Sequence, residues 1–375
     1  MSWLFNKPDE EIVAVFDIGN GSIGCAIVRL SPHGKPTVLY NHRQPMAFLQ
    51  HVTSERLLDT MVKLLKSVSQ HVGKEVWPQY RRQVRRAFCF FSSPWYMSQT
   101  RVLTIEKEKP FTVTSDLIED IFKKDAETFA QEQKTGTYEK MFGQNLHLLE
   151  KNVIHIKLNG YELPNPVNKK ARILELTFFA SFIAETIQQK IEDILQAAFH
   201  FKSISMNSFA LASWVAVRDM FPTENSFLIL DITGEVTDIM LTETGVLAEI
   251  ISFPAGRSLI LRKIVDELAV PPEVALSFLK LHNKGLVEKK FQNKMEDIIK
   301  AAQKTWSEAL TETLSLFTKQ KMMPQKMFVT VDDDVAPIFL EVLRQNTFTV
   351  VHLGEEMIQD PFVILESTFI NKAVV

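Results

Sequence analysis

The strongest constraint on the fold is a pattern that occurs twice in the chain. The segments IVAVFD, GNGS and IGCAIVRL read as strand, turn and strand. The same order returns far downstream as SFLILD, ITGEV and TDIMLTE. In each copy an aspartate, Asp17 or Asp231, ends the first strand. A repeated unit of this kind predicts a duplicated fold, with the candidate site in the cleft between the two halves.

Composition narrows the class of protein. A chain of 375 residues that is 46% hydrophobic can bury the cores of two or three lobes. Its 42 basic and 45 acidic residues give a net charge of -3, so the chain lacks the excess of positive charge that is typical of nucleic-acid-binding proteins. The two cysteines, Cys25 and Cys89, lie in apolar runs and predict neither a disulfide framework nor a metal cluster. We therefore expect a cytoplasmic protein, since no signal peptide or bilayer-spanning run is evident either.

Helices and strands alternate along the rest of the chain, which indicates α/β layers. Thr53 and Ser54 predict the start of a helix, and further helices are expected at 116–133 and 184–198. Strands are expected at 99–105, 152–158 and 171–182. A mainly helical region follows at about 258–323, and its long final helix carries an apolar stripe that we interpret as core.

The two hairpins resemble the phosphate loops of the actin and hexokinase superfamily, in particular its FtsA/PilM branch. VFDIGNGSIGCAIV is similar to the first loop, and LDITGEVTDIMLTETGVL with FPAGRSLILRKI is similar to the second. The resemblance implies duplicated actin-like, or ribonuclease H-like, lobes around a central cleft. It also implies a nucleotide site, with Asp17 and Asp231 beside Mg if Mg-ATP binds. The matching residues are Asp17, Gly19, Gly21, Ser22, Asp231, Gly234, Thr237, Asp238, Gly245 and Gly256.

The stretch LNGYELPNPVNKKARILELTFFASF follows the pattern by which a small α+β subdomain of FtsA ends and re-enters the first lobe. This resemblance divides the chain into four parts. Residues 1–91 and 184–207 are expected to form the first lobe, 92–183 the inserted subdomain, and 208–375 the second lobe with its helical subdomain at about 258–323.

The second loop departs from the superfamily's pattern at Thr233, Glu235 and Val236, where glycines and a threonine are preferred. We expect Glu235 to face the phosphates and to repel them. The glycine-rich turn on the adenosine side is replaced by Asp332, Asp333 and Asp334, which form either a solvated acidic turn or a cation site. In a later helix, Ser277 and Phe278 replace acidic residues. ATP and Mg are therefore expected to bind weakly or not at all.

The resemblance implies a non-catalytic scaffold or adaptor of the bacterial cell division machinery, whose protein partners bind the inserted subdomain. A PilM-like adaptor of pilus or secretion assembly is the first alternative. An ATP-dependent polymer is the second, so a homo-oligomer or filament stays open, and a sugar kinase ranks last. The ending STFINKAVV lacks the amphipathic membrane helix of FtsA, so we expect membrane association through partners, at the inner face of the membrane.

Overall fold

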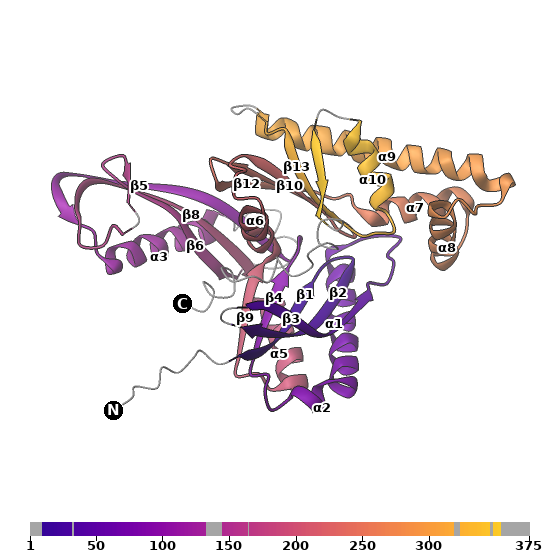
Figure 1. Cartoon of the computed structure of the whole chain (residues 1–375), viewed down its shortest axis with the longest axis horizontal. Helices are drawn as coiled ribbons and strands as arrows, with labels where there is room; N and C mark the ends of the chain where they lie inside the picture. The colour runs from indigo at the N-terminus through magenta and orange to yellow at the C-terminus, as the bar shows by residue number, and fades with distance from the viewer. Residues whose placement is uncertain are drawn as a thin grey trace.

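Two large sheets of equivalent topology organise the protein. The computed structural model describes residues 10–31, 34–132, 145–163, 165–318, 323–345 and 348–353. Within these ranges the strands form two five-stranded sheets and one four-stranded sheet (Figure 1). In each five-stranded sheet, three consecutive strands form an antiparallel meander. The first strand of the meander also pairs in parallel with a fourth strand, which pairs in parallel with a fifth. This equivalence confirms the duplicated fold that the repeated hairpins predict.

The first lobe has the strand order β3-β2-β1-β4-β9. Helix α1 begins as predicted, because the Thr53 hydroxyl accepts a hydrogen bond from the Arg56 amide. The apolar stripe of α1 is buried against the sheet and α5. The elements of this lobe are β1 (Glu11–Ile18), β2 (Ser22–Ser31), β3 (Gly34–Pro45), α1 (Ser54–Glu75), α2 (Trp77–Tyr80), β4 (Arg86–Phe91), α5 (Glu185–Phe199) and β9 (Ser203–Ser208).

The second lobe repeats this order as β12-β11-β10-β13-β14 and adds a helical layer. The long helix of this layer, α9, is amphipathic, and its stripe is core as predicted: Trp306 is fully buried between Phe253 and Phe339. The elements are β10 (Phe227–Ile232), β11 (Thr237–Glu243), β12 (Val246–Phe253), α7 (Arg257–Leu268), α8 (Pro272–Asn283), α9 (Lys289–Thr318), β13 (Lys326–Val331), α10 (Ala336–Arg344) and β14 (Thr349–His352).

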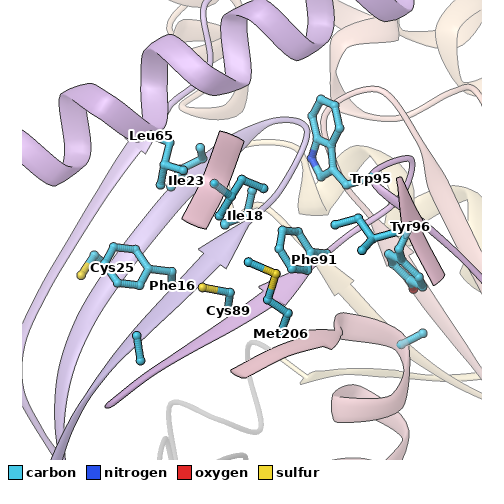
Figure 2. Packing of buried hydrophobic residues seen from close by; sticks show 14 of the residues in the cluster. Phe16, Ile18, Ile23, Cys25, Leu65, Cys89, Phe91, Trp95, Tyr96 and Met206 are labelled. Atoms are coloured by element: carbon cyan, nitrogen blue, oxygen red, sulfur yellow. The ribbon is translucent and has the colours of Figure 1, made fainter. Parts of the chain in front are cut away.

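One hydrophobic core joins the two lobes. Helix α6 (Phe209–Met220) links them, and its buried residues, including Leu211 and Trp214, belong to a cluster that contains side chains from both large sheets. Figure 2 shows part of this cluster, in which Cys25 and Cys89 are packed among apolar neighbours. Both cysteines are free, as expected, and burial raises the pKa of each thiol.

A four-stranded sheet, covered by a helix, extends from the first lobe (Figure 1). It consists of β5 (Tyr96–Thr112), α3 (Ser115–Glu132), β6 (Leu146–Leu158), β7 (Tyr161–Glu162) and β8 (Lys170–Ala184). Helix α3 packs on β8 through two ring pairs, Phe122 with Phe178 and Phe129 with Phe182. The sheet also contacts the second lobe, since the Thr100 hydroxyl donates to the Leu247 carbonyl at 2.6 Å. None of the helices in the described ranges is long and apolar enough to span a bilayer.

Candidate functional site

The two duplicated hairpins bring most of the predicted site residues to one cavity. Asp17 and Asp231 occupy equivalent positions, each between an antiparallel and a parallel neighbour. A cavity of about 300 Å³ lies between the two strand ends. Its lining includes six of the predicted residues, namely Asp17, Gly19, Gly21, Ser22, Asp231 and Gly234, together with Arg43, Ser92, Phe209, Ile232, Thr233, Thr330, Val331 and Asp332.

The tips of the two hairpins are in direct contact. A Cβ atom placed on Gly234 would lie 2.5 Å from the Cα of Gly21, and one placed on Gly21 would lie 2.8 Å from the Gly234 nitrogen. Both contacts are to backbone atoms, so only glycine fits at either position. The sequence analysis attributes these glycines to phosphate binding. In this structure they allow one loop to lie against the other.

Asn20 joins the two loops through its side-chain amide and is buried between them. Its Nδ2 donates to the Thr233 hydroxyl at 2.7 Å and to the carbonyl of Ser93, and its Oδ1 accepts from the amide of Glu235 at 2.6 Å. The bonds to Thr233 and Glu235 cross from the first lobe to the second. Asn20 therefore holds the cleft shut at the point where the loops meet, a role that the sequence analysis does not predict.

Gly245 lies in the turn between β11 and β12 with a φ of 77°, and three other predicted residues also lie outside this cavity. Thr237 is fully buried, where its hydroxyl donates to the Ala255 carbonyl at 2.6 Å and accepts from the indole of Trp306 at 3.1 Å. Gly256 immediately precedes α7, and a Cβ there would lie 2.3 Å from the Thr233 carbonyl oxygen. The carbonyl of Thr233 accepts a hydrogen bond from the first turn of α7, as does that of Gly234. The Thr237 hydroxyl and the Gly256 backbone thus pack the second lobe together.

Asp238, the third of these residues, is buried beside β12. Its Oδ1 accepts a hydrogen bond of 2.5 Å from the Ser252 hydroxyl. Burial raises the pKa of the Asp238 carboxyl, and hydrogen bonds from Ser252 and Ser93 partly offset that rise. Because Ser93 closely follows β4 of the first lobe, Asp238 forms a further link between the lobes.

Arg43 occupies the cavity beside Asp17, and the sequence analysis does not identify it. One guanidinium nitrogen lies 2.5 Å from Asp17 Oδ2, and the other donates to the Ser22 hydroxyl at 2.7 Å. Burial alone would lower the pKa of the guanidinium, but the carboxylates of Asp17, Asp332 and Asp231 together more than offset this and the pKa is raised. The guanidinium therefore engages two of the residues that the family resemblance assigns to metal and phosphate.

Asp231 has one engaged and one unengaged oxygen. Its Oδ1 accepts from the Thr330 hydroxyl at 2.6 Å, whereas its Oδ2 has no hydrogen-bond partner among the described residues. Burial raises the pKa of the Asp231 carboxyl well above its usual range, and the neighbouring Asp238 carboxylate raises it further. The second lobe thus presents to the cavity a buried carboxyl group whose ionisation is unfavourable unless a cation lies nearby.

The acidic turn after β13 is held by an arginine. Arg257 forms a bidentate ion pair with Asp334, at 2.5 and 3.0 Å, and lies 3.7 Å from Asp332. The expectation of a solvated turn therefore holds for the exposed Asp333 and is wrong for Asp334. The cation-site alternative gains no support either, since the described residues contain no group of three or more His, Cys, Asp or Glu side chains suited to a metal.

The expectation that Glu235 faces the phosphates is wrong. Its carboxylate turns away and pairs with Arg262 of α7 at 2.7 and 3.1 Å, and it lines a separate cavity of about 740 Å³ between the lobes. The physical reason is that a buried carboxylate requires a counter-charge, which Arg262 supplies from the second turn of the helix. Phe278 in turn packs edge-to-face on Phe291 and does not line the smaller cavity.

Mg-ATP does not fit the residues in this arrangement. Such loops hold phosphate through free backbone amides, and three amides of these two loops are already engaged: the amide of Gly19 donates to Ser22, that of Thr233 to Val236 and that of Glu235 to Asn20. A metal requires a free carboxylate, but Asp17 is engaged by an arginine. What closes this cleft is therefore a set of internal contacts, rather than the charge repulsion by Glu235 that the sequence suggests.

Comparison with known proteins identifies structures that share this fold. No protein-family model matches the chain, and no curated protein is similar in sequence. Among solved structures, a chain of the PilM-PilN type IV pilus biogenesis complex aligns with a TM-score of 0.62 and 13% identity, over 91% of this chain and 87% of that one. The fold is that of the actin-like ATPases. The likeness extends to the fold, and a closer kinship with FtsA stays a prediction.

Two more distant structures also align over most of the chain. One is a Bacteroides thetaiotaomicron protein with an actin-like ATPase fold and unknown function, with 10% identity, a TM-score of 0.42, and coverage of 94% of this chain and 95% of that one. The other is the ethanolamine utilization protein EutJ from Carboxydothermus hydrogenoformans, with 10% identity, a TM-score of 0.44, and coverage of 92% and 85%.

Proposed function

We propose that this protein is a PilM-like adaptor, which binds a protein partner of a membrane-associated assembly and keeps its phosphate-loop cleft shut without nucleotide. The observation that carries the proposal is the contact between the loops, where Gly21 lies on Gly234 and Asn20 bridges them. In an ATPase of this fold a nucleotide bridges the two lobes. Here the side chain of Asn20 makes the bridge, which leaves the fold free to act as a binding scaffold.

The similarity to the pilus protein favours a PilM-like adaptor over a division adaptor, because that neighbour belongs to a protein–protein complex.

The stretch LPNPVNKKARILEL, which suggests FtsA in the sequence, has a local structural role. Asn168 adopts a positive φ of 65°, and its amide bonds to the carbonyl of Val113 before β8 begins. This turn geometry returns the chain to the sheet, so the motif carries no argument for cell division.

The inserted subdomain, built from β5 to β8 with α3, is the proposed partner surface. Among the described residues it exposes four large apolar side chains, with Tyr161 at 77% and Val102 at 58%. The other two are Leu148 and Val153. Exposed apolar side chains mark protein interaction surfaces where they gather on one face. Leu148 and Val153 pair in register with Phe182 and Phe178, so these two lie on the same face of the sheet. The subdomain is also fixed to both lobes, so a bound partner is held in a defined position.

Photo-cross-linking in the source cells tests this proposal. A cross-linking amino acid at Val102 or Tyr161 should capture one membrane-associated protein, and the yield should be the same whether the extract contains Mg-ATP or a chelator. The double variant Val102→Glu with Tyr161→Glu should lose a partner captured from Leu148, whereas Val38→Glu with Leu286→Glu, at exposed apolar positions elsewhere, should retain it. Capture that requires ATP, or that is unchanged in the first double variant, would contradict the proposal.

A further inference from the structure

A row of three residues crosses the first sheet at the cavity. Arg43 on β3 is directly opposite Gly24 on β2, and Gly24 is directly opposite Asp17 on β1. The arginine must therefore pass over the middle strand to reach the aspartate. A Cβ atom on Gly24 would lie 3.0 Å from the nearer guanidinium nitrogen, so a larger side chain would obstruct this path. Glycine inside a strand commonly marks such a close approach.

The guanidinium enters a cavity whose other ionisable groups are acidic. Asp17, Asp231 and Asp332 line the same cavity, and all three carboxylates add to the charge that favours protonated Arg43. Asp231 is 5% exposed and retains an oxygen with no hydrogen-bond partner in the described ranges. An unengaged carboxylate oxygen on a buried residue that lines this cavity is a second sign, besides the acidic cluster, that the position suits a cation.

We propose that Arg43 is the resident cation of the cleft, and that it excludes divalent metal, and with it metal-nucleotide, from Asp17 and Asp231. This inference rests on the proposed function. If the cleft stays shut without nucleotide, no metal ion neutralises Asp17 and Asp231, so a side chain must supply the positive charge. Two carboxylates with water are sufficient for a Mg²⁺-sized ion, so no third protein ligand is required. Gly24 is the residue that gives Arg43 access.

The size of the effect follows from the charges. In a water-like medium, the repulsion between two unit charges about 4 Å apart weakens a binding constant roughly fivefold. The repulsion energy between the guanidinium and a divalent ion is twice as large, which squares this factor. Removing the guanidinium should therefore raise metal affinity by about thirtyfold. The Arg43 side chain is 54% exposed, so its truncation leaves no buried void and the fold should persist.

Titration with Mn²⁺, followed by the electron paramagnetic resonance of free Mn²⁺, tests the inference. Arg43→Ala should bind one Mn²⁺ about thirtyfold more tightly than wild type, and Arg43→Lys, which keeps the charge, should not. Adding Asp231→Asn to Arg43→Ala should abolish the gain. Arg218→Ala is the matched control, since it removes a paired arginine on α6 that lies beside Asp219 and outside the cavity.

The outcomes separate this inference from the proposed function. No gain in Arg43→Ala, or a gain that survives Asp231→Asn, would overturn the role of Arg43 while leaving an inert wild-type cleft and the adaptor intact. Wild-type protein that binds Mn-ATP tightly with Arg43 in place would overturn both. If Arg43 instead recruited an anion, inorganic phosphate would bind wild type and be lost in Arg43→Ala, which would also refute its role as the resident cation.

Discussion

Asn20→Ala should both destabilise the protein and loosen the contact between its lobes. The side chain makes three hydrogen bonds in a buried position, to Ser93, Thr233 and Glu235. At about 1 kcal/mol net for each bond, their loss costs roughly 3 kcal/mol in the free energy of unfolding. The Glu235 amide is also left without its acceptor inside the protein, which keeps the cost in the upper part of a range of about 2–4 kcal/mol.

Urea unfolding of wild type and variant measures this free energy, and hydrogen exchange at the Glu235 amide reports on the loop contact itself. Asn20→Asp retains the acceptor for Glu235 but loses the two donated bonds, so it should restore protection of that amide without restoring full stability. Asn41→Ala, at an exposed asparagine on β3, is the matched control. A loss of less than about 0.5 kcal/mol with an unchanged Glu235 amide would refute the reasoning.

Three further predictions concern residues whose surroundings are equally well defined. Thr237→Val should cost about 2–4 kcal/mol in thermal or urea unfolding, because the Trp306 indole N–H loses its buried acceptor; an unchanged stability would contradict the packing role. Glu235→Ala should lower the melting temperature by leaving Arg262 unpaired and should not create ATP binding; calorimetric heat with ATP in that variant would show that charge repulsion matters after all. Glu150 on β6 is buried, and its carboxyl group accepts hydrogen bonds from the Ser181 hydroxyl and the Ser208 amide. Burial raises the pKa of this carboxyl to about 7, so it binds its proton more tightly when folded and stability should fall as pH rises from about 4.5 to 7; Glu150→Gln should flatten that slope.

The duplicated fold could be predicted because both hairpins carry buried, β-branched strands that end in aspartate, a pattern local to each segment. Strand ends were harder to place. Strand β5 extends to Thr112 and β6 begins at Leu146, well beyond the expected limits. The outer portion of β5 is largely charged and exposed, and that of β6 mixes exposed and half-buried residues across a register shift between Leu148 and Glu150. Hydrophobic periodicity therefore fails there, although the backbone pairing with β8 continues.

The candidate site was predictable where it depends on glycine and aspartate within one hairpin, and not where it depends on contacts between distant segments. Glu235 was misplaced because its partner, Arg262, comes from a helix that the loop sequence does not specify. Arg43 left one trace in the sequence, the isolated Gly24 inside a strand, which indicates that another group crosses the strand there. Asn20 left none, since its role depends on the position of the second lobe.

Calorimetric titration of the wild-type protein with ATP and Mg²⁺ tests the central claim most directly, which is that internal contacts close this actin-like cleft in place of a nucleotide. The structure predicts no detectable heat up to millimolar ATP, because three of the loop amides and Asp17 are already engaged within the protein. Micromolar binding that is lost in Asp17→Ala would contradict the claim, since it would mean that the loops part and Arg43 yields to a metal-bound nucleotide.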